Sequence, residues 1–72
     1  MAAPTYSGYQ AIIAELAPGY DPRHIEACMR LQHGTLDHLT REDFAREAQI
    51  GVEFIRQAGR DEAEALAVSY GL

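Results

Sequence analysis

Four side chains of types that often bind metal ions lie within one short segment: His24, Cys28, His33 and His38. His24 and Cys28 are four residues apart, so on a helix they share one face, as the ligand pairs of helical zinc sites do. The two later histidines would have to fold back across Gly34 to join them. Closely spaced ligand pairs and a second cysteine are absent from the sequence. The pattern therefore favours a buried structural Cys28 with surface histidines near a helix end, and we expect no bound metal.

The sequence carries no pattern of a nucleophilic or phosphate-binding enzyme. Ser7 and Ser69 lie near the two ends, not in the strand-turn-helix elbow of a catalytic serine. Cys28 could be activated by His24, but its apolar neighbours predict an inert buried thiol. A glycine-rich phosphate loop is absent. We therefore expect a protein that is not an enzyme and uses no cofactor.

Length and charge limit the class of protein further. Seventy-two residues suffice for one small domain, and 47% of them are apolar, which is too many for a disordered tail. Six Arg against eleven acidic residues give a net charge of -5, which opposes binding to nucleic-acid phosphates. The absence of Lys and Asn favours a GC-rich bacterial or phage genome.

The sequence predicts a cytoplasmic protein. No apolar run approaches the roughly 18 residues of a membrane span. The N-terminus lacks the basic and apolar regions of a secretory signal. A single cysteine cannot form an intramolecular disulfide and suits a reducing compartment. We expect residues 1–6 to be frayed and residues 7–72 to form one helical domain.

Helix start signals divide the chain into four helices, and no alternating strand pattern is present. The first helix begins with the capping-box pattern of Ser7 and Gln10, and the second with Asp21 as N-cap. Thr40 caps the third helix, with Asp43 as its weaker capping-box partner. The sequence therefore predicts an all-α fold, a compact four-helix domain with helices over about 8–17, 22–33, 41–58 and 62–70.

Proline and glycine separate these helices. Pro22 suits the first position of the second helix, and Gly34 suits its C-cap. Residues 36–39 are expected to form a short helical turn with two apolar anchors. Gly59 closes the third helix, and Asp61 is expected to start the fourth.

The third predicted helix is apolar on two faces. One stripe faces the core and consists of Phe44, Ala48, Val52 and Ile55. Ile50 and Phe54 lie on a different face. Gly51 in a helix interior costs about 0.5–1 kcal/mol relative to Ala, so a closely approaching helix is a reason to keep it. Either this helix is central and wrapped by the other three, or its second face meets a second copy or a foreign protein.

Residues 40–59 also fit the spacing of a helix-turn-helix, with apolar anchors at Phe44, Ala45, Ala48, Ile50, Ile55 and Ala58. In this stretch the chain resembles small phage-type helix-turn-helix regulators, and the resemblance implies an alternative function as a DNA-binding regulator. Gln49 departs from the pattern, because a glycine is preferred at the turn. Only Arg56 and Arg60 offer positive charge in the recognition helix, so a continuous helix fits better.

We therefore expect a small non-catalytic protein-interaction module of the accessory or inhibitor type, of the kind that phages and mobile elements encode. It is expected to bind another protein, a second copy of itself, or both. Aromatic residues and arginines are the usual anchors of such interfaces. We expect Glu42 to pair with Arg46 on a solvated helix face. The expected partner-binding residues are Ile50, Phe54, Arg46, Arg56, Arg60, Tyr20 and Tyr70.

Overall fold

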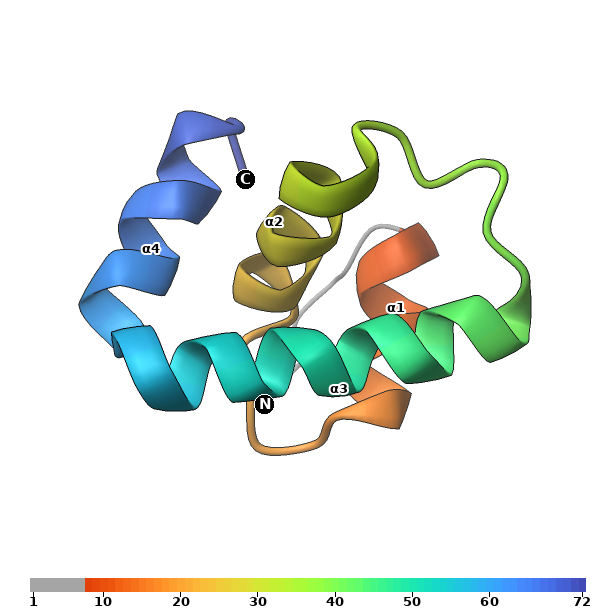
Figure 1. The fold of residues 1–72 in the computed structure, drawn as a ribbon, viewed down its shortest axis with the longest axis horizontal. Helices are drawn as coiled ribbons and strands as arrows, with labels where there is room; N and C mark the ends of the chain where they lie inside the picture. Colours follow the sequence, from red (N-terminus) through yellow and green to blue (C-terminus); the bar gives the residue numbers. More distant parts are fainter. Residues whose placement is uncertain (1–7) are drawn as a thin grey trace, which may run out of the picture.

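The computed structural model describes residues 8–72, which form four α-helices and no β-strand. The helices are α1 (Gly8–Leu16), α2 (Pro22–His33), α3 (Arg41–Ala58) and α4 (Arg60–Ser69) (Figure 1). The predicted all-α four-helix fold is confirmed, with each boundary within two residues of its expected place. The expected Ser7 cap and the segment 1–6 lie outside the described residues. None of the described helices is both long enough and apolar enough to cross a membrane.

The predicted caps of α2 and α3 are confirmed. The side chain of Asp21 accepts a hydrogen bond of 2.9 Å from the backbone N–H of Arg23, and Pro22 occupies the first turn. Thr40 and Asp43 form the reciprocal capping box, each side chain accepting from the other's backbone N–H at 3.1 and 3.0 Å. Local sequence therefore determines where the two longest helices begin.

The connector between α2 and α3 and the start of α4 differ from expectation. Residues 36–39, expected to form a short helical turn, form a hydrogen-bonded turn that is not part of a helix, closed by one hydrogen bond of 3.2 Å from the N–H of Leu39 to the carbonyl of Leu36. One such bond is too little to propagate a helix. α4 begins at Arg60, directly after Gly59, and not at Asp61. Asp61 instead lies in the first turn, where the helix dipole favours a negative charge.

α3 is one uninterrupted helix from Arg41 to Ala58. The helix-turn-helix interpretation of residues 40–59 required a turn at Gln49, but Gln49 lies inside the helix. Glutamine is a good helix former and lacks the conformational freedom of glycine, so no local signal interrupts the helix here. The expectation of a continuous helix is confirmed.

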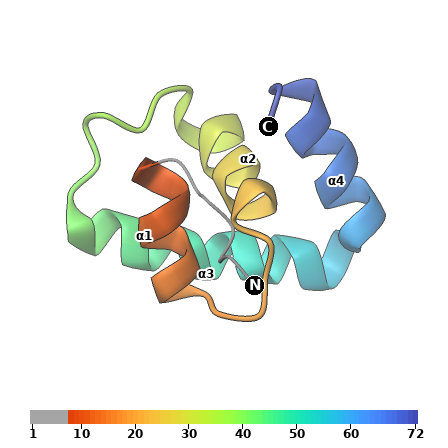
Figure 2. The same cartoon turned by 180° about the vertical axis from the view of Figure 1, so that it is seen from behind.

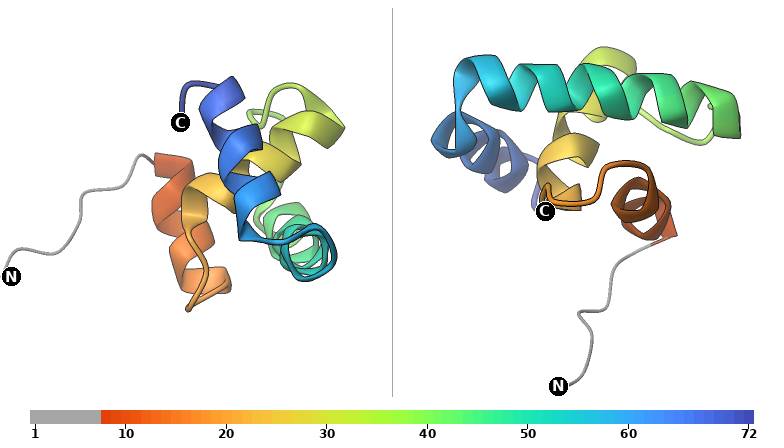
Figure 3. Two further views of the ribbon diagram at one scale, coloured as in Figure 1. Left: turned by 90° about the vertical axis from the view of Figure 1, so that its left-hand side faces the viewer. Right: turned by 90° about the horizontal axis from the view of Figure 1, so that it is seen from below.

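α2 and α3 each contact all three other helices, whereas α1 and α4 do not contact each other. α2 is buried at Pro22 and at residues 24–29, but α3 keeps one side exposed along its length, so the other three helices contact α3 without wrapping it. α3 lies along one side of the molecule, with α1 and α4 on the other side and α2 between them (Figure 3). Seen from behind, α1 lies across the N-terminal half of α3, and α4 lies near its C-terminal end (Figure 2).

The core fills the space where α2 meets the other helices. Ile13 of α1, Ile25 and Met29 of α2 and Leu36 of the connector are almost completely buried. Further buried members of the core are Ala17, Phe44, Ala48, Val52, Ile55 and Ala63. The predicted inward stripe of α3 is therefore confirmed, and Leu36 anchors the connector even though it is not helical.

Gly51 lies at a close approach between α3 and α2, as its place inside the third predicted helix led us to expect. A Cβ atom at this position would lie 3.2 Å from Cγ2 of Ile25 and 3.6 Å from its Cα. Ile25 is fully buried, and its branched side chain has little rotamer freedom. Even a single Cβ atom at position 51 would thus be a tight contact that Ile25 has to relieve by a small shift, and a larger side chain would not fit without moving α2.

Replacing Gly51 with Leu should destabilise the fold by about 1–3 kcal/mol, because the added side chain overlaps Ile25. Gln49→Leu is the matched control, since Gln49 is exposed on the same helix and the change should stay within about 0.5 kcal/mol. Urea unfolding followed by circular dichroism gives both values. Equal unfolding midpoints for the two variants would contradict the close approach.

Candidate functional site

The side of α3 that faces away from the core forms a continuous exposed strip. We call this strip the α3 face; it consists of Glu42, Arg46, Gln49, Ile50, Glu53 and Gln57. These positions recur at helical spacing and lie within one sector of the helix, opposite the buried stripe. Ile50, 41% exposed, is the one large apolar side chain among them. The strip is thus polar except at its middle.

Phe54 and Arg46, two further residues of the expected surface, lie beside Ile50. Phe54 is half-buried at the edge of the α3 face and packs against the core cluster. It therefore contributes to the core as well as to the surface. Arg46 is exposed and pairs with Asp43, three residues earlier, and not with Glu42 as expected. The capping hydrogen bonds to Thr40 hold Asp43 near Arg46, which explains why Arg46 pairs with Asp43.

Tyr20 and Arg56 form a contact of their own at the other edge of α3. The Nε of Arg56 donates a hydrogen bond of 3.2 Å to the hydroxyl of Tyr20, and its guanidinium lies 3.3 Å from Glu53. Six residues of helix rotate Arg56 about 120° away from Ile50. Tyr20 is half-buried against the core. The structure therefore brings these two residues together but does not place them beside Ile50.

Arg60 and Tyr70 lie at the two ends of α4. Arg60 begins α4 and is exposed. Tyr70 follows its last turn and is 40% exposed, at the end of α4 that points away from α3 (Figure 1). Of the seven expected partner-binding residues, Ile50, Phe54 and Arg46 thus lie on one part of the surface, Tyr20 and Arg56 form a separate pair, and Arg60 and Tyr70 lie apart from both groups.

A cluster that the sequence did not reveal joins the start of α2 to α4. The Nε2 of His24 lies 2.8 Å from Oε1 of Glu64 and 3.8 Å from Oδ2 of Asp21. Because an ionised carboxylate only accepts, the Nε2 of His24 carries the proton in the contact with Glu64. Arg23 reaches Oδ2 of Asp21 at 3.1 Å and the main-chain oxygen of Leu72 at 3.1 Å. It also pairs with Glu64. We call these four side chains the α2–α4 clasp.

The α2–α4 clasp is the one group in residues 8–72 whose ligand atoms lie close enough together to hold a metal ion, through Asp21, His24 and Glu64. The guanidinium of Arg23, however, contacts one carboxylate oxygen of Asp21 and one of Glu64 in the same cluster. It already supplies a positive charge to both carboxylates. In this structure the cluster therefore joins α4 and the main chain of Leu72 to α2.

Arg23 and His24 also change the acidity of the clasp carboxyls. Hydrogen bonds from His24 and then from Arg23 lower the pKa of Glu64 below its ordinary value of 4.5. Burial alone would raise the pKa of Asp21, but the hydrogen bonds and charge of Arg23 outweigh it and lower that pKa below 3.8. Both carboxyls are therefore ionised partners of the clasp at neutral pH.

The histidines considered as possible metal ligands in the sequence lie at two different places in the structure. His24 belongs to the clasp at the first turn of α2 and is buried, which corrects the expectation of surface histidines. His33, the last residue of α2, packs edge-to-face against His38, with ring centroids 5.9 Å apart. Its buried Nε2 lies 3.2 Å from Oε1 of Glu47 without hydrogen-bond geometry. The structure therefore does not bring the three histidines of this segment together at one place.

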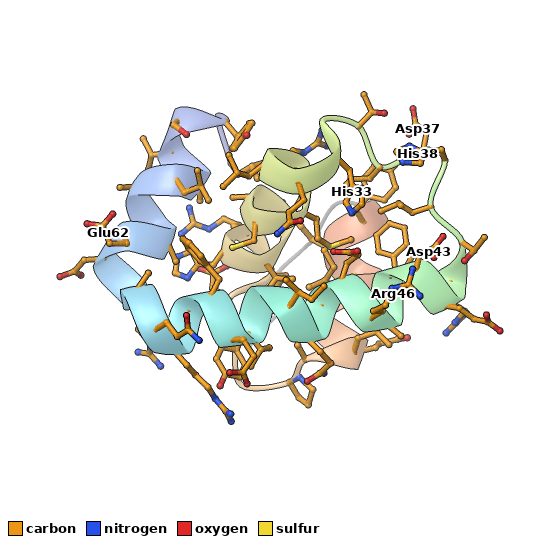
Figure 4. The ribbon with its side chains drawn as sticks, viewed as in Figure 1. His33, Asp37, His38, Asp43, Arg46 and Glu62 are labelled. Carbon is orange, nitrogen blue, oxygen red and sulfur yellow. The ribbon has the colours of Figure 1, made fainter. Side chains whose placement is uncertain are left out.

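Several polar residues gather around the connector between α2 and α3. Asp37 and His38 belong to the connector, His33 lies near them at the end of α2, and Asp43 and Arg46 lie below them on α3, whereas Glu62 projects from α4 at the opposite end of the molecule (Figure 4). The hydroxyl of Tyr9 donates to Asp37, and the ring of Tyr9 stacks on Phe44 with centroids 5.6 Å apart. These contacts tie α1 to the connector.

Cys28 is buried, as predicted, with 6% of its surface exposed. Burial raises the pKa of its thiol from 9.0 to about 11. Since the thiolate is the reactive form, the position disfavours nucleophilic chemistry at neutral pH. No pocket is found among residues 8–72.

Replacing Glu64 with Gln should lower stability at neutral pH, because the amide cannot form the ion pairs with Arg23 and His24. The pKa values of Glu64 and Asp21 are lower in the folded protein than their ordinary values, so both ionised carboxyls stabilise the fold above pH 4.5. This stabilisation is lost as the pH falls through the lowered pKa values. The difference between wild type and variant should therefore shrink below pH 4.5. Urea-unfolding midpoints across this pH range measure it.

Glu62→Gln is the control for this measurement. It removes the same charge from the first turn of α4 at an exposed position outside the clasp. If both variants show the same pH profile, the clasp does not stabilise α4.

The thiol of Cys28 should react with a disulfide reagent far more slowly in the folded protein than in urea. At pH about 8, raising the pKa from 9.0 to about 11 alone reduces the thiolate about 100-fold, and burial restricts access further. Absorbance of the released thiol follows both reactions. Similar rates in buffer and in urea would show that Cys28 is not buried.

Comparison with known proteins identifies no relative of this chain. No family model matches it, and neither the curated proteins nor the solved structures contain a match. Its function therefore has to be argued from its own residues and their geometry.

Proposed function

We propose that this chain is a small non-catalytic protein-interaction module that binds its partner through the α3 face. One observation carries the proposal: the longest helix buries one side and keeps the large apolar Ile50 41% exposed at the middle of the other. The positions around it are polar or charged, with Arg46 on one side and Glu53 on the other. An apolar centre with a charged rim is typical of protein interfaces.

The composition supports the same class of function. The net charge of -5 opposes a nucleic-acid partner, and a lone buried Cys28 suits the reducing cytoplasm. We therefore assign the protein to the accessory or inhibitor type, of the kind that phages and mobile elements encode. Such a protein acts by occupying a surface of another molecule, and it needs an exposed anchor more than a cavity.

Ile50 is the better probe of this surface, because Phe54 also packs against the core. Ile50→Glu should abolish association while changing stability by less than about 0.5 kcal/mol, since the side chain is on the surface. Val68→Glu is the matched control, because Val68 is an exposed aliphatic side chain on α4. Light scattering over a concentration series up to about 1 mM, where weak complexes form, gives the solution mass.

The outcomes of this concentration series distinguish a protein partner from a DNA partner. Association that Ile50→Glu abolishes and Val68→Glu leaves intact supports the proposal. A mass that rises only with duplex DNA at about 50 mM salt overturns it in favour of a DNA-binding regulator. If the protein is monomeric, a photo-crosslinking residue at position 50 or 68 is tested in the source cell. A protein captured from position 50 but not from 68 supports the proposal; no preference for position 50 overturns it.

A further inference from the structure

We propose that the partner on the α3 face is a second copy of the chain, with the two α3 helices antiparallel and Arg46 of each copy facing the partner's Glu53. This inference rests on the proposed function, because it uses the same face. It adds the identity of the partner and the register of the contact.

The order of charges along the α3 face is the first argument. Arg46 lies one turn before the middle of the face at Gln49 and Ile50, and Glu53 lies one turn after it. A two-fold axis between Gln49 and Ile50 therefore brings Arg46 opposite the partner's Glu53, and does so twice. A two-fold contact uses the same surface on both copies, so one strip with this internal order is sufficient.

A parallel arrangement of the same face is disfavoured. It would place Arg46 opposite the partner's Arg46 and Glu53 opposite the partner's Glu53. Like charges facing each other suppress such pairings, and the parallel helix dipoles would add to the repulsion. The antiparallel register is the one in which the exposed charges of the face attract.

The ion pairs within each chain extend this pattern. Arg46 pairs with Asp43 and Glu53 pairs with Arg56, and both arginine side chains remain more than 60% exposed. Joining the helices at Arg46 and the partner's Glu53 produces a row of four charges of alternating sign, ending in the partner's Arg56. Each carboxylate and guanidinium has lone pairs or N–H groups left for the second contact.

Ile50 supplies the apolar part of the contact. Next to a two-fold axis, it lies against the partner's Gln49 and the partner's Ile50, so its exposed fraction is covered by the other copy. The strip is only as long as α3, which is about 27 Å for 18 residues at 1.5 Å each. Each copy contributes one exposed apolar side chain, and the whole contact contains two ion pairs. Such a contact is small, so the dimer is expected to be weak and salt-sensitive.

Charge reversal tests this register. Arg46→Glu and Glu53→Arg should each weaken self-association at least about tenfold, because each places two like-charged pairs across the contact. The double variant Arg46→Glu/Glu53→Arg restores opposite charges and should associate within about threefold of wild type. An equimolar mixture of the two single variants should also associate, since both pairs are then complementary. Sedimentation equilibrium measures the dissociation constants, and melting temperatures confirm that each variant is folded.

The alternatives give different results. In a parallel dimer, position 46 faces the partner's position 46 and position 53 faces the partner's position 53. Like charges then face each other in the wild type and in each variant, so neither single variant would weaken such a dimer. Undiminished association of both single variants therefore overturns the inference. Wild-type association that Ile50→Glu abolishes, without rescue in the double variant or the mixture, rejects the register but leaves the proposed function standing. A monomer that is captured by a foreign protein through position 50 also rejects the second copy as partner while the proposed function stands.

Discussion

The close contact between Ile25 and Gly51 determines how the rest of the domain is arranged. It brings the backbone of α2 against the middle of α3, and with α1 and α4 also packed against it α2 is buried at Pro22 and at residues 24–29. α1 and α4 pack against the α2–α3 pair at separate places. Because α2 occupies the inner side of α3, the opposite side of α3 has no helix to cover it. The α3 face, with Ile50 at its centre, is the side of α3 that this packing leaves uncovered.

The α2–α4 clasp compensates for what α4 lacks in apolar surface. The two fully buried side chains of α4 are alanines, Ala63 and Ala67, and each buries little area. Directed polar contacts from Arg23 and His24 to Glu64 fix the position that packing alone would specify weakly. α1 is held in a comparable way, since Gln10 donates to the buried Glu26 of α2.

The fold could be predicted from local signals, because capping residues and helix-ending glycines act within a few positions of the chain. Asp21, Thr40 and Gly34 marked their helix ends correctly. The clasp could not be predicted, because Glu64 lies 40 residues from His24 and its chemistry is that of any surface glutamate until α4 packs against α2. The partner-binding surface was predicted only in part for the same reason. Helical spacing predicts which α3 residues share a face with Ile50, but it does not predict the tertiary hydrogen bond between Tyr20 and Arg56.

The absence of contact between α1 and α4 has a consequence for how the domain opens. Among the helices, each of these two contacts only α2 and α3, and the further tie of α1 through Tyr9 goes to the connector and not to α4, so either can detach without removing a packing partner of the other. Local opening should then occur as two separate events on either side of the α2–α3 pair, whose amides exchange with solvent only on global unfolding. The contact pattern therefore divides the molecule into a two-helix centre, α2 with α3, and two flanking helices that do not touch each other.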